Sequence, residues 1–197
     1  LKDLAATIRE IMGRREVWLF LLAYWLYIDG VHTIIRMAVD FGLSLGFGQQ
    51  SLIAALLLVQ FIGFPAAIGF GWLASRWETK KAIYLGLTIY GAISAWGYFL
   101  TAVWQFYVMA AAIGLVQGGV QSLSRSYFAR LIPQAKSGEY FGIYNMMGKF
   151  AAVLGPILVG VTAAATGSAR ASIVSVVVLF IAGGVLLTRV DARRAKT

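Results

Sequence analysis

The chain has 197 residues, of which 60% are hydrophobic and only 13% are charged. A soluble domain needs a surface of which about 25–35% is charged, so the composition excludes a water-soluble globule and predicts an integral membrane protein. The net charge of +9 comes from basic residues between apolar runs, so we expect lipid as a partner and no nucleic acid. One histidine and no cysteine predict neither a metal site nor a cofactor.

The first 16 residues mix charged residues with apolar residues at helical spacing. This pattern is typical of a short amphipathic helix on the cytoplasmic face of a membrane, but an ordinary polar linker fits equally well. Residues 189–197 are predicted to form a basic cytoplasmic tail. The chain begins with Leu1 instead of Met, so we expect a processed or truncated piece of something longer.

Between these ends the sequence contains six long apolar runs. Each is long enough to cross about 30 Å of hydrocarbon as a helix. They cover residues 17–41, 52–73, 82–103, 106–128, 141–164 and 172–188. The predicted fold class is therefore an all-α membrane protein with six transmembrane helices in residues 17–188.

Basic residues alternate between the loops in a way that predicts the orientation. One side of the membrane would carry Lys2, Arg9, Arg14, Arg15, Arg76, Lys80, Lys81, Arg125, Arg130, Lys136, Arg189, Arg193, Arg194 and Lys196. The other side would carry Arg170 alone. Because cytoplasmic loops are enriched in Lys and Arg, both termini are predicted to be cytoplasmic, and we expect a bacterial inner membrane.

The loop between the second and third runs has a recognisable pattern. Its key residues are Gly71, Arg76, Lys80 and Lys81, and it resembles the loop signature of the major facilitator superfamily. Ser75 stands where that signature has Asp, which puts a charge-relay role in doubt. An ordinary basic cytoplasmic loop would look similar.

Three stretches carry a closer resemblance: residues 26–34, 114–126 and 141–156. They are similar to the C-terminal half of the vacuole effluxer family, a branch of the major facilitator superfamily. This resemblance implies a twelve-helix transporter of which this chain supplies the last six helices, and fungal members export amino acids from the vacuole. It also implies two inverted three-helix repeats, residues 17–103 and 106–188, around a site near the midplane.

Asp29, His32, Arg36 and Asp40 lie on one stripe of the first predicted helix, at 100° per residue. Charges at the bilayer centre cost roughly 2.5–3.5 kcal/mol each, so we expect the stripe to face a partner or a wet cavity. Further candidates for a substrate or proton site are Gln60, Gln117, Gln121, Asn145 and Lys149. Asp29 and Lys149 would suit a zwitterionic solute, but a static pair that locks two helices together is the alternative.

Glycine spacing predicts close helix contacts. Gly114 and Gly118, and likewise Gly138 and Gly142, are four residues apart and allow two helices to approach closely. The Gly155-Pro156 pair predicts a kink in the fifth helix.

These features favour half of a secondary transporter that moves small polar solutes, such as amino acids, by alternating access. Proton coupling is a hypothesis motivated by Asp29 and His32. The partner would be the missing N-terminal half or a second identical copy in a symmetric dimer. The alternatives are a non-transporting interaction module, an inactive truncated half or a simple pore. No nucleophile–base pair or metal cluster is evident in the sequence, so we do not expect an enzyme.

Overall fold

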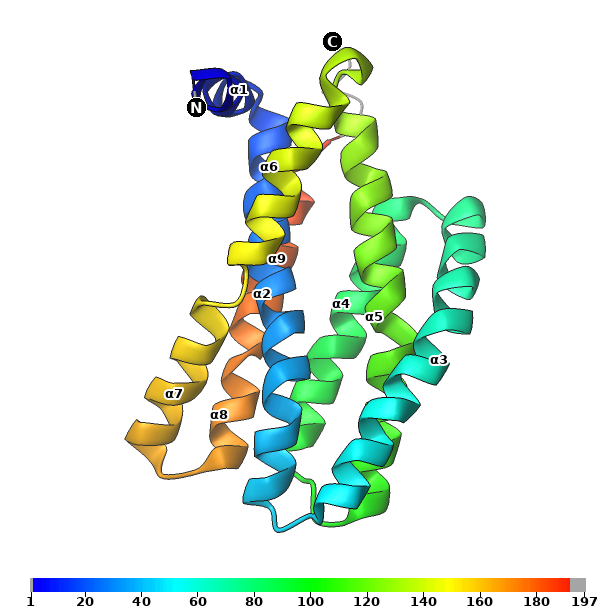
Figure 1. The fold of residues 1–197 in the computed structure, drawn as a ribbon, viewed down its shortest axis with the longest axis vertical. Coiled ribbons are helices and arrows are strands. Elements are labelled where there is room, and N and C mark those ends of the chain that lie inside the picture. The colour runs from blue at the N-terminus through cyan, green and yellow to red at the C-terminus, as the bar shows by residue number, and fades with distance from the viewer. Residues whose placement is uncertain (1, 192–197) are drawn as a thin grey trace.

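The computed structural model describes residues 2–191, and it describes side chains from residue 7 onward. Arg193, Arg194 and Lys196 of the predicted basic tail therefore lie outside the described residues. The described part contains helices and connecting loops without strands, so the all-α prediction is confirmed. The helices are α1 Lys2–Gly13, α2 Arg15–Ser44, α3 Gln49–Arg76, α4 Thr79–Gly97, α5 Val103–Leu131, the short 3-10 helix Gln134–Lys136, α6 Ser137–Phe150, α7 Leu154–Thr166, α8 Ala169–Ser175 and α9 Val177–Thr188 (Figure 1).

Five helical segments of the described chain are long and apolar enough to cross a membrane. They are α2, α3, α5, the segment Gln134–Thr166 that contains α6 and α7, and the segment Ala169–Thr188 that contains α8 and α9. The third predicted span corresponds to α4, which is not among the five. This helix opens on Thr79-Lys80-Lys81 and ends at Gly97, short of the predicted end at Val103. Five of the six predicted spans are thus supported by length and composition.

The fifth predicted span is interrupted. Helix α6 ends at Phe150 and α7 begins at Leu154, with three non-helical residues between them. The kink expected at Gly155-Pro156 is therefore a break that begins earlier in the chain. Pro156 lies in the first turn of α7, where the missing backbone N–H of proline removes no intrahelical hydrogen bond.

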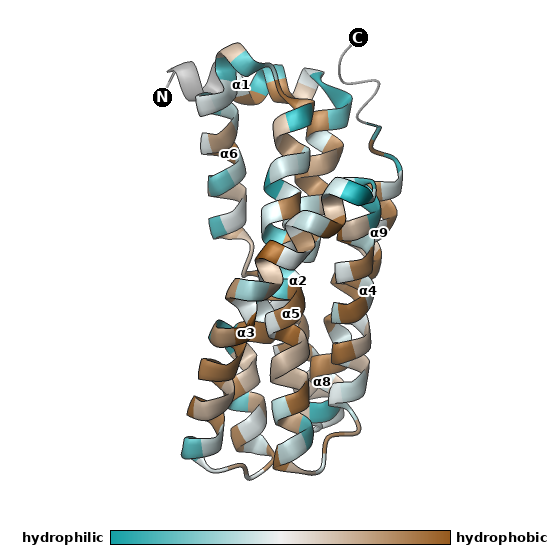
Figure 2. Ribbon diagram, turned by 90° about the vertical axis from the view of Figure 1, so that its right-hand side faces the viewer, coloured by the Kyte–Doolittle hydropathy of each residue, from teal (hydrophilic) through white to brown (hydrophobic). Residues whose placement is uncertain are grey.

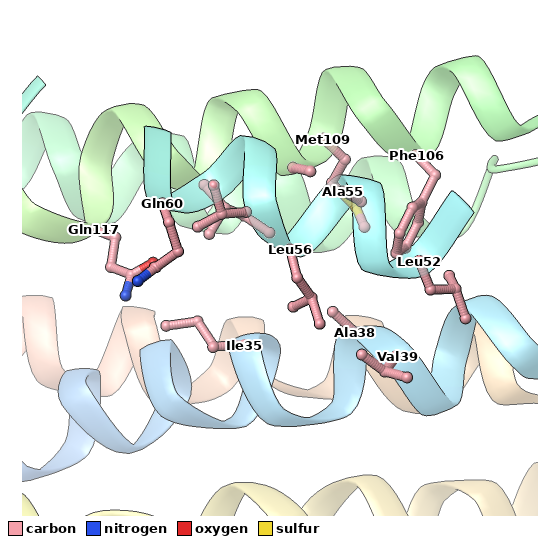
Figure 3. Close-up of a pocket in the computed structure, with 13 residues that line it drawn as sticks. Ile35, Ala38, Val39, Leu52, Ala55, Leu56, Gln60, Phe106, Met109 and Gln117 are labelled. Carbon is pink, nitrogen blue, oxygen red and sulfur yellow. The ribbon is translucent and has the colours of Figure 1, made fainter. Parts of the chain in front are cut away.

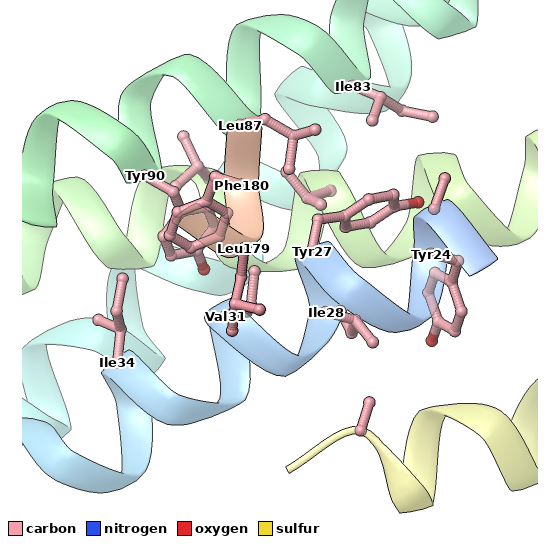
Figure 4. Close-up of a cluster of buried hydrophobic side chains, with 14 of the residues drawn as sticks. Tyr24, Tyr27, Ile28, Val31, Ile34, Ile83, Leu87, Tyr90, Leu179 and Phe180 are labelled. Carbon is pink, nitrogen blue, oxygen red and sulfur yellow. The ribbon is translucent and has the colours of Figure 1, made fainter. Parts of the chain in front are cut away.

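The core lies where α2 passes between its neighbours. Helix α2 packs along α9, α3 packs along α5, and α4 packs against both α5 and α9 (Figure 1). Side chains of α2, α4 and α9 fill the space between them, as Figure 4 shows. The rings of Tyr90 and Phe180 stack with centroids 5.5 Å apart. The Tyr27 hydroxyl is within 2.7 Å of Ser124 Oγ, so this buried phenol has a polar partner.

Only one of the two predicted glycine pairs packs against a neighbouring helix. A Cβ added to Gly114 would lie 2.8 Å from the backbone oxygen of Val59, and one added to Gly118 would lie 3.0 Å from Ala67 Cβ. Both glycines therefore bring α5 against the backbone of α3. A Cβ at Gly138 or Gly142 would meet nothing within 4 Å, so the packing predicted for that pair is wrong within the described chain.

The opposite face of α3 is apolar and uncovered. The side chains of Phe61 and Phe64 are 78% and 76% exposed, and Figure 2 shows strongly hydrophobic residues along this helix. A face this apolar needs lipid or another protein surface against it.

One end of the bundle, which we call the α1 end, carries a set of polar contacts. Lys136 Nζ donates to Glu10 Oε2 at 2.7 Å, and Thr7 Oγ1 donates to Glu139 Oε2 at 2.6 Å, so α1 is tied to the start of α6. The hydrogen bond from Lys136 lowers the pKa of Glu10 below its ordinary value. The backbone N–H of Asp191 donates to Glu16 Oε2 at 2.7 Å. The start of α2 and the residues that follow α9 therefore meet at this end.

Candidate functional site

Asp29 of α2 is fully buried and is directed at the start of α7. Its Oδ2 accepts the N–H of Val153 at 3.2 Å and of Leu154 at 2.9 Å, and its Oδ1 accepts the N–H of Gly155 at 2.8 Å. The first N–H groups of a helix have no partner within the helix and carry a partial positive charge. A carboxylate accepts hydrogen bonds from these N–H groups and carries the opposite charge. Asp29 of α2 therefore caps the start of α7.

Close approach of α2 to α7 requires Gly155. A Cβ at this position would collide with Thr33 Oγ1 and would lie 2.8 Å from Asp29 Oδ1. Thr33 in turn donates from its hydroxyl to the Asp29 carbonyl oxygen at 2.8 Å. Glycine is the residue that leaves room for a side chain to reach the backbone of α7.

His32 contacts the same break from one turn further along α2. Its Nδ1 lies 2.8 Å from the carbonyl oxygen of Ala151, between α6 and α7. A carbonyl oxygen only accepts, so Nδ1 carries the hydrogen. We call Asp29, His32 and Gly155 together the α2–α7 clasp.

The remaining charged candidates do not join the clasp. Arg36 and Asp40 are exposed on α2, and Lys149 is exposed in the last turn of α6. Among the side chains that the structure describes, neither Asp29 nor Lys149 makes an ion pair, so the anticipated Asp29–Lys149 pair is not formed. Asn145 is also exposed on α6. Asp29 instead accepts hydrogen bonds from backbone N–H groups, and no pattern of side chains in the sequence predicts these partners.

A separate cavity lies between α2, α3 and α5. Its volume is about 120 Å³, and most of its wall is apolar. Ile35, Leu52 and Met109 line it with other apolar residues, and Gln60 and Gln117 form a polar end where their amide groups meet (Figure 3). Gln117 Oε1 is buried and has no hydrogen-bond partner in the described structure.

The structure thus separates the polar residues that the sequence grouped together. Gln60 and Gln117 share the cavity, whereas Asp29 and His32 hold the helix break. Gln121 is half-buried on α5 and does not line the cavity. The apolar lining could not be recognised in advance, because such residues look the same in any membrane helix. Gly155 next to a proline was the one available signal of a break.

Basic side chains in and beside the loop between α3 and α4 make contacts within the protein. Arg76 stacks over Trp72 at 4.4 Å, and Lys81 lies 3.7 Å from Glu78. Lys80 Nζ donates to the carbonyl oxygens of Thr188 at 3.0 Å and Val190 at 2.7 Å, so it joins the start of α4 to the end of α9. These carbonyls include unpaired acceptors of a helix C-terminus, where a cation is favourable. Gly71 is exposed, and an added Cβ there would meet nothing within 4 Å.

Comparison with known proteins identifies the family. The family model described as "Vacuole effluxer Atg22 like" matches residues 1–197. The chain belongs to the Atg22-like vacuole effluxer family.

Relatives of this Atg22-like chain occur in bacteria and fungi. It is 42% identical to the uncharacterized MFS-type transporter YxiO of Bacillus subtilis over 94% of the chain and 44% of the relative. It is 30% identical to autophagy-related protein 22 of Yarrowia lipolytica over 99% of the chain and 35% of the relative. Autophagy-related protein 22-1 of Aspergillus niger is 31% identical over 99% of the chain and 34% of the relative. The chain therefore spans less than half the length of these curated relatives.

Proposed function

We propose that this chain is half of a secondary transporter, and that the whole protein moves small polar solutes across a membrane by alternating access. Membership of the effluxer family and 42% identity to a protein named as an MFS-type transporter support this function. The observation that carries it is the cavity between α2, α3 and α5, which has a polar end formed by Gln60 and Gln117. A polar group held inside a membrane helix bundle is costly unless it serves a ligand or a partner.

The proposed topology places the α1 end in the cytoplasm of a bacterial inner membrane. The basic residues of the α3–α4 loop and of the loop between α5 and α6 support this orientation. The bacterial relative supports the choice of membrane. We also propose that residues 17–103 and 106–188 are the two inverted repeats, because α3 packs on α5 of the other repeat and α9 packs on α2.

The second half of the transporter would be further sequence of the same protein or a second copy of this chain. The exposed apolar face of α3 supports a partner surface, since the described part of the chain leaves most of the side chains of Phe61 and Phe64 exposed. More than half of the bacterial relative has no counterpart here, which favours further sequence as the partner.

Proton coupling is a finer part of the same proposal. Asp29 and His32 are the titratable groups of the clasp, and a proton on Asp29 would weaken its hold on α7. Lys149, Asn145 and Gln121 would contribute to binding in another conformation or across the partner half.

Flux into proteoliposomes tests the function. The protein is expressed from the native reading frame that contains this chain, reconstituted, and supplied with radiolabelled amino acids with and without an imposed pH gradient. We expect saturable uptake above that of empty liposomes, and a pH gradient should accelerate it. Uptake equal to that of empty liposomes across the panel would favour the alternative, a non-transporting interaction module.

A further inference from the structure

A basic hollow of about 470 Å³ lies at the α1 end, between the junction of α1 with α2 and the loop that follows α5 (Figure 1). Arg14 and Arg130 are its charged side chains, and Pro133 and Gln134 line it from the loop. None of the described residues that line it is acidic. The hollow thus combines two cations with room for more than a single water.

Both arginines lie at the ends of membrane-crossing helices. Arg14 immediately precedes α2, and Arg130 lies in the last turn of α5. Each of these helices is long and apolar enough to cross a membrane, so the residues at their ends lie at the level of the lipid headgroups. Basic pockets between transmembrane helices at this level are typical binding sites for anionic headgroups.

Neither arginine has a strong ionic partner within the described chain. Arg130 is exposed and belongs to none of the ion pairs between described residues. Arg14 Nη2 lies 3.5 Å from Glu10 Oε1, whereas Lys136 Nζ lies 2.7 Å from Glu10 Oε2. The pair of Arg14 with Glu10 is partly exposed and contributes little. Most of the five N–H donors of Arg14 therefore remain for another anion.

A second hollow beside the same arginine provides a contrast. It is lined by Arg130 together with Glu78, Lys80 and Asp191. The two carboxylates of this second hollow repel an anion, whereas the first hollow has two cations and no carboxylate among its described lining residues. Of the two hollows that Arg130 borders, only the one shared with Arg14 suits an anionic ligand.

We propose that the hollow between Arg14 and Arg130 binds a phosphate group, and that the two guanidinium groups donate to its oxygens. A guanidinium matches a phosphate because two of its N–H groups reach two oxygens at once. The position favours a lipid headgroup as the source, since Ile132 and Pro133 add apolar surface beside the arginines. A soluble phosphate ester is the other source. Headgroup phosphates occur at both surfaces of a bilayer, so the site requires neither transport nor the proposed orientation.

Three ligands test the phosphate and separate its two sources. Dioleoylphosphatidylglycerol carries the phosphate and the acyl chains, dioleoylglycerol carries the chains alone, and glycerol 3-phosphate carries the phosphate alone. Native mass spectrometry measures the binding of each to the whole protein, purified in an uncharged detergent. We expect phosphatidylglycerol to bind at least about tenfold more tightly than dioleoylglycerol, as hydrogen bonds between charged groups predict. Glycerol 3-phosphate that binds as tightly as the lipid would support the phosphate site and assign it to soluble esters.

Arg130→Gln removes one cation from the hollow. We expect the preference for phosphatidylglycerol over dioleoylglycerol to fall about tenfold. Arg14→Gln should cause a similar loss, and it tests the hollow if the first variant does not fold. Arg9→Gln is the matched control, because Arg9 is exposed on α1 at the same end of the protein and does not line the hollow. It makes the same change in net charge and should keep the preference.

Two results would overturn the proposal. The first is equal binding of phosphatidylglycerol and dioleoylglycerol to the wild type, with no binding of glycerol 3-phosphate. The second is an equal loss of preference in Arg9→Gln and in the variants of Arg14 and Arg130, because the basic surface as a whole would then attract the lipid. Flux measured on the same variants has no bearing on either result, so the lipid site and the proposed transport can fail separately.

Discussion

Asp29 Oδ1 accepts the backbone N–H of Gly155 at 2.8 Å, across 126 residues of sequence. The carboxylate belongs to α2 and the amide to the first turn of α7, so the contact joins the two helices at the point where the fifth segment is interrupted. This relationship gives Asp29 a structural role that any transport role must accommodate.

Asp29→Asn should destabilise the fold. The amide has one acceptor oxygen and no charge, whereas the carboxylate accepts three backbone N–H groups at the positive end of α7. Hydrogen bonds to a buried charge contribute about 1.5–3 kcal/mol, so we expect a loss of about 2 kcal/mol and a lower Tm in detergent. Asp40→Asn is the control, since Asp40 is exposed on the same helix. Equal Tm values for the two variants would show that the cap contributes little.

Gly155→Ala should also weaken the clasp. The added methyl would overlap Thr33 Oγ1 and press on Asp29 Oδ1, and overpacking of this kind costs about 1–3 kcal/mol. Gly160→Ala makes the same change on the same helix where an added Cβ meets nothing within 4 Å. Thermal unfolding of both variants is the measurement, and we expect the second to match or exceed the wild type, since alanine is the better helix former. A stable Gly155→Ala protein would mean that α2 and α7 can separate without loss.

Gly114→Ala should loosen the contact between α3 and α5. The new Cβ would lie 2.8 Å from the carbonyl oxygen of Val59, which belongs to rigid helix backbone. The helices must move apart, and we expect a stability loss of about 1–3 kcal/mol. Gly142→Ala is the comparison, because a Cβ there has open space. Cysteine crosslinking between α3 and α5 should slow in the first variant and stay unchanged in the second.

The contact of Glu10 with Lys136 should respond to acid. Because Lys136 lowers the pKa of Glu10 from 4.5, the charged pair is fully formed above that pH, and it is lost as the pH falls through the lowered pKa. A spin label at Met12, which is 59% exposed on α1, should become more mobile over this acidic range. Glu10→Gln should make the label insensitive to pH in this range. A transition that survives in Glu10→Gln would assign the effect to another group.

Helix positions were predictable because long apolar runs have few other stable arrangements in a membrane. The predicted run 17–41 corresponds to α2, and 106–128 to α5. The partners of polar residues were not predictable in the same way. Asp29 and Lys149 have opposite charges, but Asp29 binds backbone donors that become available only because α7 starts a new helix. The amino-acid sequence does not show which backbone N–H groups will lack a hydrogen-bond partner.

Gln60 and Gln117 were both candidates for one site, and the structure brings their amides to one end of the cavity. Gln121, one turn beyond Gln117, was grouped with them but does not line the cavity. The contours of a cavity depend on the distance between helix axes, which local spacing does not specify.

The interruption at residues 151–153 changes how the fifth segment would respond to mechanical force. A continuous helix passes tension along its ladder of backbone hydrogen bonds, but here the ladder stops at Phe150 and resumes at Leu154. Tension applied to α6 would therefore reach α7 through the backbone of residues 151–153, and the Asp29 side chain on α2 would hold the start of α7 against it. In single-molecule extraction from a bilayer, α6 should leave in one step. Helix α7 should follow only after its hydrogen bonds to Asp29 of α2 break.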